Sequence, residues 1–180
     1  MLYYLSTIPS PVGPLTLASD GEALTGLWIE GQKYFRSTVP DGEKQSADLP
    51  IFHTAKSWLD RYFAGEKPAL SGLLLRPAGG KFRQEVWKLL CEIPYGELTT
   101  YGALASRMAK LLGRAHMSAQ AVGGAVGHNP ISILIPCHRV VGANGSLTGY
   151  AGGIDLKRKL LRHEGADLSR LSVPKTGTAL

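Results

Sequence analysis

The chain has 180 residues, a net charge of +6 and a hydrophobic content of 44%. That length fits one or two small domains, and that hydrophobic content supports a packed core and excludes a disordered chain. No apolar run in the sequence approaches the roughly 20 residues that a membrane-spanning helix requires. Residues 1–10 lack the basic and apolar regions of a signal peptide, so we expect a cytoplasmic protein with no membrane partner.

Strand-like segments and turns alternate in the first part of the chain. The predicted strands are Leu2–Thr7, Leu15–Ser19, Leu24–Ile29 and a last one at Leu73–Leu75. The turn-forming residues Pro9–Pro14 and Asp20–Gly21 separate the first three strands and predict a hairpin or meander. Polar residues over 36–50 predict a loop. Apolar residues at helical spacing then predict a helix over Ile51–Ala64, which Gly65 can end.

The pattern becomes helical after Pro77–Gly80, the candidate linker. The predicted helices are a stripe from Phe82 to Leu90, a helix capped by Thr99 or Thr100 that runs through Met108, a helix over Ala119–Val126 capped by Ser118, and a last one capped by Asp155 and ended by Gly165. The second and third of these fit a helix-turn-helix, although an ordinary helical hairpin would show the same pattern. Residues 166–180 show little periodicity and predict a flexible tail.

The positive charge is concentrated in the second part of the chain. Residues 1–78 carry 7 Lys and Arg against 8 Asp and Glu, whereas residues 79–165 carry 11 against 5. A basic module joined to a near-neutral one is typical of a polyanion-binding protein, and a solvated basic surface is the alternative.

The third predicted helix is rich in glycine. Ala121–Gly127 contains three glycines, and each costs about 1 kcal/mol relative to alanine inside a helix. Such small residues allow another surface to approach closely. That surface is either a neighbouring helix or a nucleic-acid backbone.

Two cysteines, Cys91 and Cys137, are too few for a disulfide scaffold or a tetrahedral metal site. The five histidines lack ligand spacing with either cysteine, so we expect free thiols, no metal and no other cofactor. Cys137 directly precedes His138 and Arg139, and a thiolate next to a base is a strong nucleophile. An inert buried cysteine and a cysteine hydrolase remain open, but a hydrolase would need an oxyanion hole that the sequence does not reveal.

The segment Ile133–Val141 resembles the active-site signature of the O6-alkylguanine-DNA alkyltransferases, also called methylated-DNA–protein-cysteine methyltransferases. The resemblance covers residues 80–165 nearly throughout, in the motifs Phe82–Trp87, Pro94–Tyr101, Ala121–Gly124, Asn129–Pro130, Gly149–Gly153 and Leu160–Gly165. The N-terminal part resembles the family more loosely, chiefly in Ser10–Leu15.

This resemblance implies an α+β fold in two domains. Residues 1–78 are expected to form a small RNase-H-like α/β domain. Residues 79–165 are expected to form a helical catalytic domain with a winged-helix or helix-turn-helix motif that binds DNA, before the flexible tail of residues 166–180.

The resemblance also implies DNA repair by irreversible transfer of a methyl or larger alkyl group to Cys137. The donor is O6-alkylguanine, and also O4-alkylthymine, in double-stranded DNA. Because the target atom lies inside a stacked duplex, the base must first be flipped out. Each molecule acts once, the DNA is its only implied partner, and we expect a monomer.

By the same resemblance, His138 takes the thiol proton of Cys137 through a water, Glu164 orients His138, and Tyr101 gives a proton to the departing base. The other implied substrate- and DNA-binding residues lie on the glycine-rich helix and near the cysteine: Gln120, Ala121, Gly123, Gly124, Asn129, Arg139, Val140, Tyr150 and Ala151. Among these, Asn129 is the expected hinge, the carbonyls of Cys137 and Val140 recognise the guanine amine, and Tyr150 covers the base.

Two positions depart from the family pattern. Gln120 stands where many members carry an arginine that fills the gap left by the flipped base, which predicts weaker flipping unless Arg114 or another residue compensates. Ala151 replaces a small hydroxyl residue, so a hydrogen bond to the departing oxygen must come from backbone N–H groups. A lesion-binding relative without repair activity is the alternative function, but such proteins replace the reactive cysteine.

Overall fold

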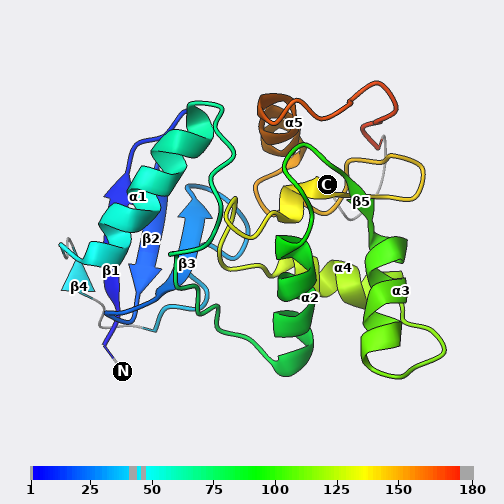
Figure 1. Ribbon diagram of the computed structural model, residues 1–180, viewed down its shortest axis with the longest axis horizontal. Coiled ribbons are helices and arrows are strands. Elements are labelled where there is room, and N and C mark those ends of the chain that lie inside the picture. Colours follow the sequence, from blue (N-terminus) through cyan, green and yellow to red (C-terminus); the bar gives the residue numbers. More distant parts are fainter. Residues whose placement is uncertain (1, 41–43, 46–47, 175–180) are drawn as a thin grey trace. The chain divides into compact units, whose positions relative to one another are not determined.

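The computed structural model describes residues 2–40, 44–45 and 48–174. They form two compact units, and the first consists of the residues up to Ala78 together with the short segment Pro130–Leu134 (Figure 1). The second unit contains Gly79–Asn129 and the chain from Ile135 onward. No helix in the described part of the chain is long and apolar enough to cross a membrane.

A four-stranded sheet forms the base of the first unit, with the strand order β3-β2-β1-β4. Its strands are β1 (Tyr4–Ile8), β2 (Leu15–Ser19), β3 (Leu24–Ile29) and β4 (Lys44–Gln45). The first three pair antiparallel, which confirms the predicted meander, and β4 pairs parallel to β1. The short strand β4 lies in the region predicted as a loop. A two-residue strand carries too few alternating side chains for its period to be visible in the sequence.

The outer edge of β3 is completed by two segments that are distant in the sequence. Leu24 forms a bridge with Leu75, and Leu27 forms one with Ile131. The predicted strand at Leu73–Leu75 is therefore reduced to this single bridge. An open strand edge leaves backbone N–H and C=O groups without partners. These two short segments supply hydrogen-bond partners to backbone groups at the outer edge of β3.

The helix α1 (Pro50–Phe63) packs against β2 and β3. Pro50 stands at its start, where a backbone N–H would find no partner within the helix, so the missing N–H of proline costs nothing there. Its buried face consists of Ile51, Phe52, Ala55, Leu59 and Tyr62. Gly65 follows the last turn at φ +86°, a conformation that glycine adopts at low cost, so the predicted helix end is confirmed.

The second unit is mostly helical. Its helices are α2 (Lys81–Cys91), α3 (Tyr101–Leu111), α4 (Ala119–Gly127) and α5 (Ile154–His163). As predicted, Thr100 and Ser118 cap α3 and α4, because their hydroxyls accept hydrogen bonds from the N–H groups of Ala103 and Ala121. The helices α2, α3 and α4 pack against one another, and α3 and α4 form the helix-turn-helix.

The start of α5 differs from the prediction. Gly153, at φ +87°, is the N-cap residue, and Asp155 lies inside the first turn. An acidic side chain there still favours the helix through the helix dipole, which is why Asp155 resembles a cap in the sequence.

Residues 166–172, the described first part of the predicted tail, pack onto the second unit. Ala166 is buried in a small apolar cluster against which Leu168 and Leu171 also pack. The N–H of Leu147 donates to the carbonyl of Ser172 at 2.9 Å. Isolated leucines in an irregular segment leave no period in the sequence, and residues 175–180 of the predicted tail lie outside the described residues.

A parallel pair of short strands, β5 (Thr99–Thr100) and β6 (Val140–Val141), completes the second unit.

Candidate active site

Cys137 begins a short 3₁₀ turn at the end of the loop that starts at Asn129, and it is 5% exposed. The side-chain amide of Asn129 donates to the carbonyl of Ile135 at 2.8 Å and to the sulfur of Cys137 at 3.1 Å. Asn129 therefore closes the base of this loop and holds the sulfur directly, which the predicted hinge position did not specify.

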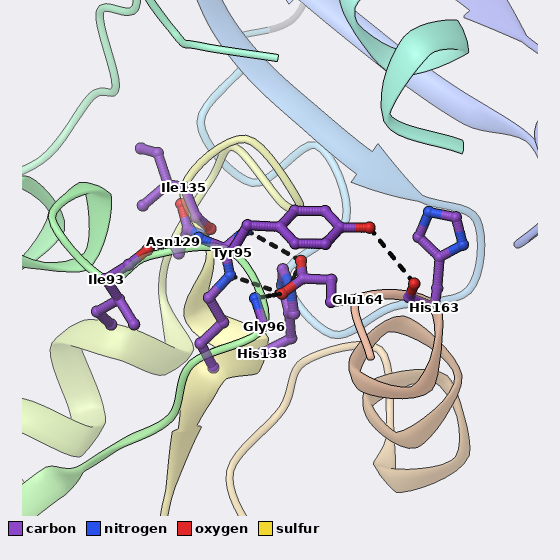
Figure 2. Close-up of polar contacts among 9 residues, drawn as sticks. Ile93, Tyr95, Gly96, Asn129, Ile135, His138, His163 and Glu164 are labelled. Atoms are coloured by element: carbon purple, nitrogen blue, oxygen red, sulfur yellow. Dashed lines mark hydrogen bonds and ion pairs between the residues drawn. The ribbon is translucent and has the colours of Figure 1, made fainter. Parts of the chain in front are cut away.

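His138 and Glu164 form a fully buried pair. The imidazole Nε2 of His138 lies 2.7 Å from Oε1 of Glu164, and neither side chain is exposed. Glu164 is the C-cap residue of α5, so the end of that helix places the carboxylate against the histidine (Figure 2). The sequence predicted these two residues together, 26 positions apart.

The carboxylate of Glu164 accepts several further hydrogen bonds. Arg139 donates to it through Nε at 2.8 Å and Nη2 at 3.0 Å, and the N–H of Gly96 donates at 3.1 Å. Burial alone would raise the pKa of Glu164, but the hydrogen bonds from His138 and Arg139 outweigh it and hold that pKa far below its ordinary value. Glu164 is therefore ionised at neutral pH.

Arg139 directs its guanidinium into the protein. Besides the two bonds to Glu164, its Nη1 donates to the carbonyl of Ile93 at 2.6 Å. The side chain is 9% exposed. Its described contacts orient Glu164, and its predicted role at the DNA or substrate stays a prediction.

His138 is arranged as a neutral base. Burial lowers its pKa, against the opposing effect of Glu164, so the ring is uncharged at neutral pH. With Glu164 ionised, Nε2 carries the proton and donates it to the carboxylate. Nδ1 is buried and has no hydrogen-bond partner among the described residues. The lone pair on Nδ1 can therefore accept a proton.

The thiol of Cys137 needs such a base. Burial raises its pKa, and the amide of Asn129 and the charge of Lys157 oppose this only in part. The sulfur is protonated at rest and becomes nucleophilic when its proton is removed. A thiol with a raised pKa and a neutral, carboxylate-bound histidine are the two groups that an activated nucleophile combines.

Lys157 is a site residue that the sequence reasoning missed. It is fully buried, and its ammonium group donates to the carbonyls of Val140 and, at 2.7 Å, Thr148. Burial lowers its pKa to about 8, although the charge of Cys137 acts in the opposite direction. The signal was present in the sequence, because positions 157, 160, 161 and 164 follow helical spacing on the buried face of α5.

Tyr101 and Tyr150 also belong to the second unit. The hydroxyl of Tyr101 donates to the carbonyl of Thr148 at 2.9 Å, so this carbonyl joins Tyr101 to Lys157. Burial raises the pKa of Tyr101 far above its ordinary value, which keeps the phenol protonated. Tyr150 is buried and its ring is roughly perpendicular to that of His138, and its hydroxyl has no hydrogen-bond partner among the described residues. Ala151 follows it and is partly exposed.

The helix α4 separates a buried face from a small-residue surface. Val122, Ala125 and Val126 are buried, and the exposed residues include Gln120, Ala121 and Gly124. A methyl group added at Gly124 would meet nothing within 4 Å among the described residues. No neighbouring helix therefore requires glycine at this position.

Gly123 lies closer to the site than Gly124 does. A methyl group added there would approach the ring of Tyr101 to 3.6 Å, which is ordinary van der Waals contact. Gly123 is therefore the residue of the glycine-rich helix that faces the ring of Tyr101.

Two family models match the chain. The ribonuclease-like domain of 6-O-methylguanine DNA methyltransferase matches residues 3–77, and the DNA binding domain of the same methyltransferase matches residues 81–166. The chain belongs to the 6-O-methylguanine DNA methyltransferase family. These matches confirm the resemblance and the predicted α+β fold for this methyltransferase.

Curated relatives of this methyltransferase carry a consistent name. The methylated-DNA–protein-cysteine methyltransferase of Haemophilus influenzae is 46% identical over 163 residues, which cover 91% of this chain and 86% of the relative. The protein of the same name from Mycobacterium bovis is 46% identical over 164 residues, which cover 91% and 93%.

A solved structure agrees with the fold as well. The crystal structure of Mycobacterium tuberculosis OGT in complex with DNA has a TM-score of 0.77 and 43% sequence identity, and the match covers 95% of each chain. This methyltransferase is therefore similar in sequence and in fold to a protein whose structure was solved in complex with DNA.

Proposed function

We propose that this methyltransferase repairs DNA by transferring a methyl or larger alkyl group from O6 of guanine in double-stranded DNA to its own Cys137. O4-alkylthymine is the proposed second substrate. The resulting thioether has no step that would release the alkyl group, so each molecule acts once. The names of the curated relatives support transfer to a cysteine, and the DNA complex of the Mycobacterium tuberculosis protein supports DNA as the partner.

The main support for transfer to Cys137 is the buried His138. Its Nε2 is hydrogen-bonded to Glu164, and its Nδ1 has no hydrogen-bond partner among the described residues. This is the arrangement that a thiol with a raised pKa requires. A cysteine that served only to fill the core would need no neutral base next to it in sequence, with an ionised carboxylate behind that base.

The reaction balances as a displacement at the alkyl carbon. His138 accepts the thiol proton of Cys137 at Nδ1, directly or through a water, and the sulfur forms a bond to the alkyl carbon. The bond between that carbon and O6 breaks, and its electron pair stays on the guanine. Tyr101 donates a hydrogen bond and then a proton to the guanine, and solvent restores both side chains. The net change moves one proton from sulfur to guanine.

DNA binding is proposed for the exposed face of α4. This helix carries no charged residue, so its contribution is close approach through Ala121 and Gly124 rather than charge. The basic residues elsewhere in the second unit supply attraction to phosphates without sequence preference. Such binding suits a protein that must search any sequence for damage and flip out the damaged base. We further propose that the protein acts as a cytoplasmic monomer.

The experiment is intact-mass analysis and peptide mapping after incubation with a duplex that contains one O6-methylguanine. We expect one methyl group on Cys137, an equal loss from the DNA and no second turnover. Cys91, an exposed free thiol with a raised pKa, serves as an internal control and should stay unmodified. Binding to the duplex without methyl gain would refute the transfer and favour a lesion-binding function.

A further inference from the structure

The loop between Asn129 and Cys137 contains two consecutive tight turns. The N–H of Leu134 donates to the carbonyl of Ser132 at 2.8 Å, and the N–H of Cys137 donates to the carbonyl of Ile135 at 2.8 Å. Hydrogen bonds between residues two apart define γ-turns. These turns determine the path by which the chain reaches the nucleophile.

The first of these turns is strained. Its central residue, Ile133, has φ +70°. A β-branched residue is rarely found at positive φ, and such a conformation persists only where the surroundings over-determine it. Ile133 is also 1% exposed, so its side chain cannot move freely to relieve the strain. Something must therefore hold the residues on either side of it.

Ser132 is held from both its main chain and its side chain. Its N–H donates to the carbonyl of Leu27 in β3 at 2.8 Å. Its hydroxyl donates to Oε1 of Gln32 at 3.0 Å. The same oxygen of Gln32 accepts the N–H of Ile29 at 2.8 Å. Gln32 is 6% exposed, so this network is sheltered from water.

We propose that Gln32 is a positioning residue for the methyl transfer, because it holds Ser132 and so maintains the strained loop whose two ends carry Asn129 and Cys137. This rests on the proposed function, since the reaction it serves is transfer to Cys137. Without the Gln32–Ser132 bond, Ile133 relaxes toward negative φ and Ile135 shifts. The carbonyl of Ile135 is a partner of Asn129, so the sulfur moves relative to the groups that hold it.

The test measures the single-turnover rate of methyl transfer at saturating DNA, together with DNA affinity and the melting temperature. Gln32→Met removes the accepting oxygen at nearly constant volume. We expect the rate to fall roughly tenfold or more, because small misplacements of a reacting atom cost this much. DNA affinity should stay within about twofold, since the DNA-facing helix is unchanged.

Three further variants separate positioning from stability. Gln32→Glu keeps an oxygen that accepts both hydrogen bonds and should restore most of the rate. Ser132→Ala leaves Gln32 bound to Ile29 and should slow transfer as Gln32→Met does, so it replaces that variant if Gln32→Met fails to fold. Leu59→Ala destabilises the same unit from the buried face of α1, and it should leave the rate unchanged below its melting temperature.

These measurements distinguish a failure of the proposed methyl transfer from a failure of the positioning role of Gln32. If the wild-type protein gains no methyl group, the proposed function fails. If the wild type reacts and both Gln32→Met and Ser132→Ala react equally fast, the positioning role is overturned. It is also overturned if the rate follows the melting temperature across all variants, Leu59→Ala included. A double variant Gln32→Met, Ser132→Ala that is no slower than Gln32→Met alone would support one shared interaction.

Discussion

The imidazole of His138 and the carboxylate of Glu164 meet at 2.7 Å in a site where neither side chain is exposed to solvent. The pair comes from a 3₁₀ turn and from the end of α5, and Arg139 completes the charge balance. Burial lowers the pKa of His138, and the ionised carboxylate of Glu164 opposes this in part. His138 is therefore neutral but can still accept a proton. Removing the negative charge should therefore affect both chemistry and stability.

We expect Glu164→Gln to slow methyl transfer by roughly 10²-fold or more, the usual contribution of a general base. The amide cannot stabilise a protonated His138, and it leaves Arg139 without its carboxylate. Stability should fall by about 3–5 kcal/mol, as when one partner of a buried ion pair is removed. Single-turnover kinetics and denaturant unfolding measure these effects. Glu97→Gln makes the same chemical change at an exposed position and should alter neither, and a Glu164→Gln rate within twofold of the wild type would contradict this role.

Lys157 predicts a distinct dependence of stability on pH. Its pKa falls from an ordinary value of 10.5 to about 8 in the folded protein. Between these values the unfolded chain holds a proton on Lys157 that the folded chain has lost. The free energy of unfolding should therefore rise with pH across this window, by about 3 kcal/mol in total, and be flat with respect to this group below pH 8.

The measurement is the free energy of unfolding in urea from pH 7.5 to 10.5, roughly the window of this titration. It compares the single variant Cys137→Ala with the double variant that carries both Cys137→Ala and Lys157→Met. The shared Cys137→Ala change removes the titration of the thiol from both proteins. We expect the rise with pH in the first protein and its absence in the second. Equal pH profiles would show that Lys157 keeps its charge when the protein folds.

The sequence predicted the regular elements well because their signals are local. The strands β2 and β3 follow from short extended segments bounded by turn residues, and the caps Thr100 and Ser118 follow from polar residues before helices. The catalytic residues were proposed from a resemblance, and the structure places His138 against Glu164.

The parts that the sequence could not predict depend on contacts between distant residues. Pro130–Leu134 belongs to the first unit through backbone bonds to β3, and backbone bonds carry no sequence signature. The bond from Ser132 to Gln32 joins residues 100 positions apart. Lys157 was overlooked because a lysine is almost always exposed, although its spacing placed it on the buried face of α5.

Gln120 is exposed near the start of α4, at the position where the family resemblance predicts an arginine that fills the space left by a flipped base. We expect Gln120→Arg to speed methyl transfer at low DNA concentration, because a cation with a planar surface stabilises the extruded state better than an amide does. Transfer rates on a duplex with one O6-methylguanine, compared with Gln120→Lys as a charge-only control, measure this. An unchanged rate would show that position 120 does not limit flipping, and a rate loss in Arg114→Ala would then identify the compensating residue.

Gly124→Ala should change stability and DNA affinity in opposite directions. Alanine is favoured over glycine inside a helix by about 1 kcal/mol, and the added methyl group meets nothing within 4 Å, so unfolding should cost more free energy. The same methyl group projects from the proposed DNA-binding face and should weaken binding to undamaged duplex several-fold. Gly102→Ala is the matched control in α3, where the added group approaches only Thr100, at 3.9 Å, and should spare DNA affinity. If Gly124→Ala stabilised the protein and bound DNA as tightly as the wild type, the glycine-rich helix would not be the surface that approaches DNA.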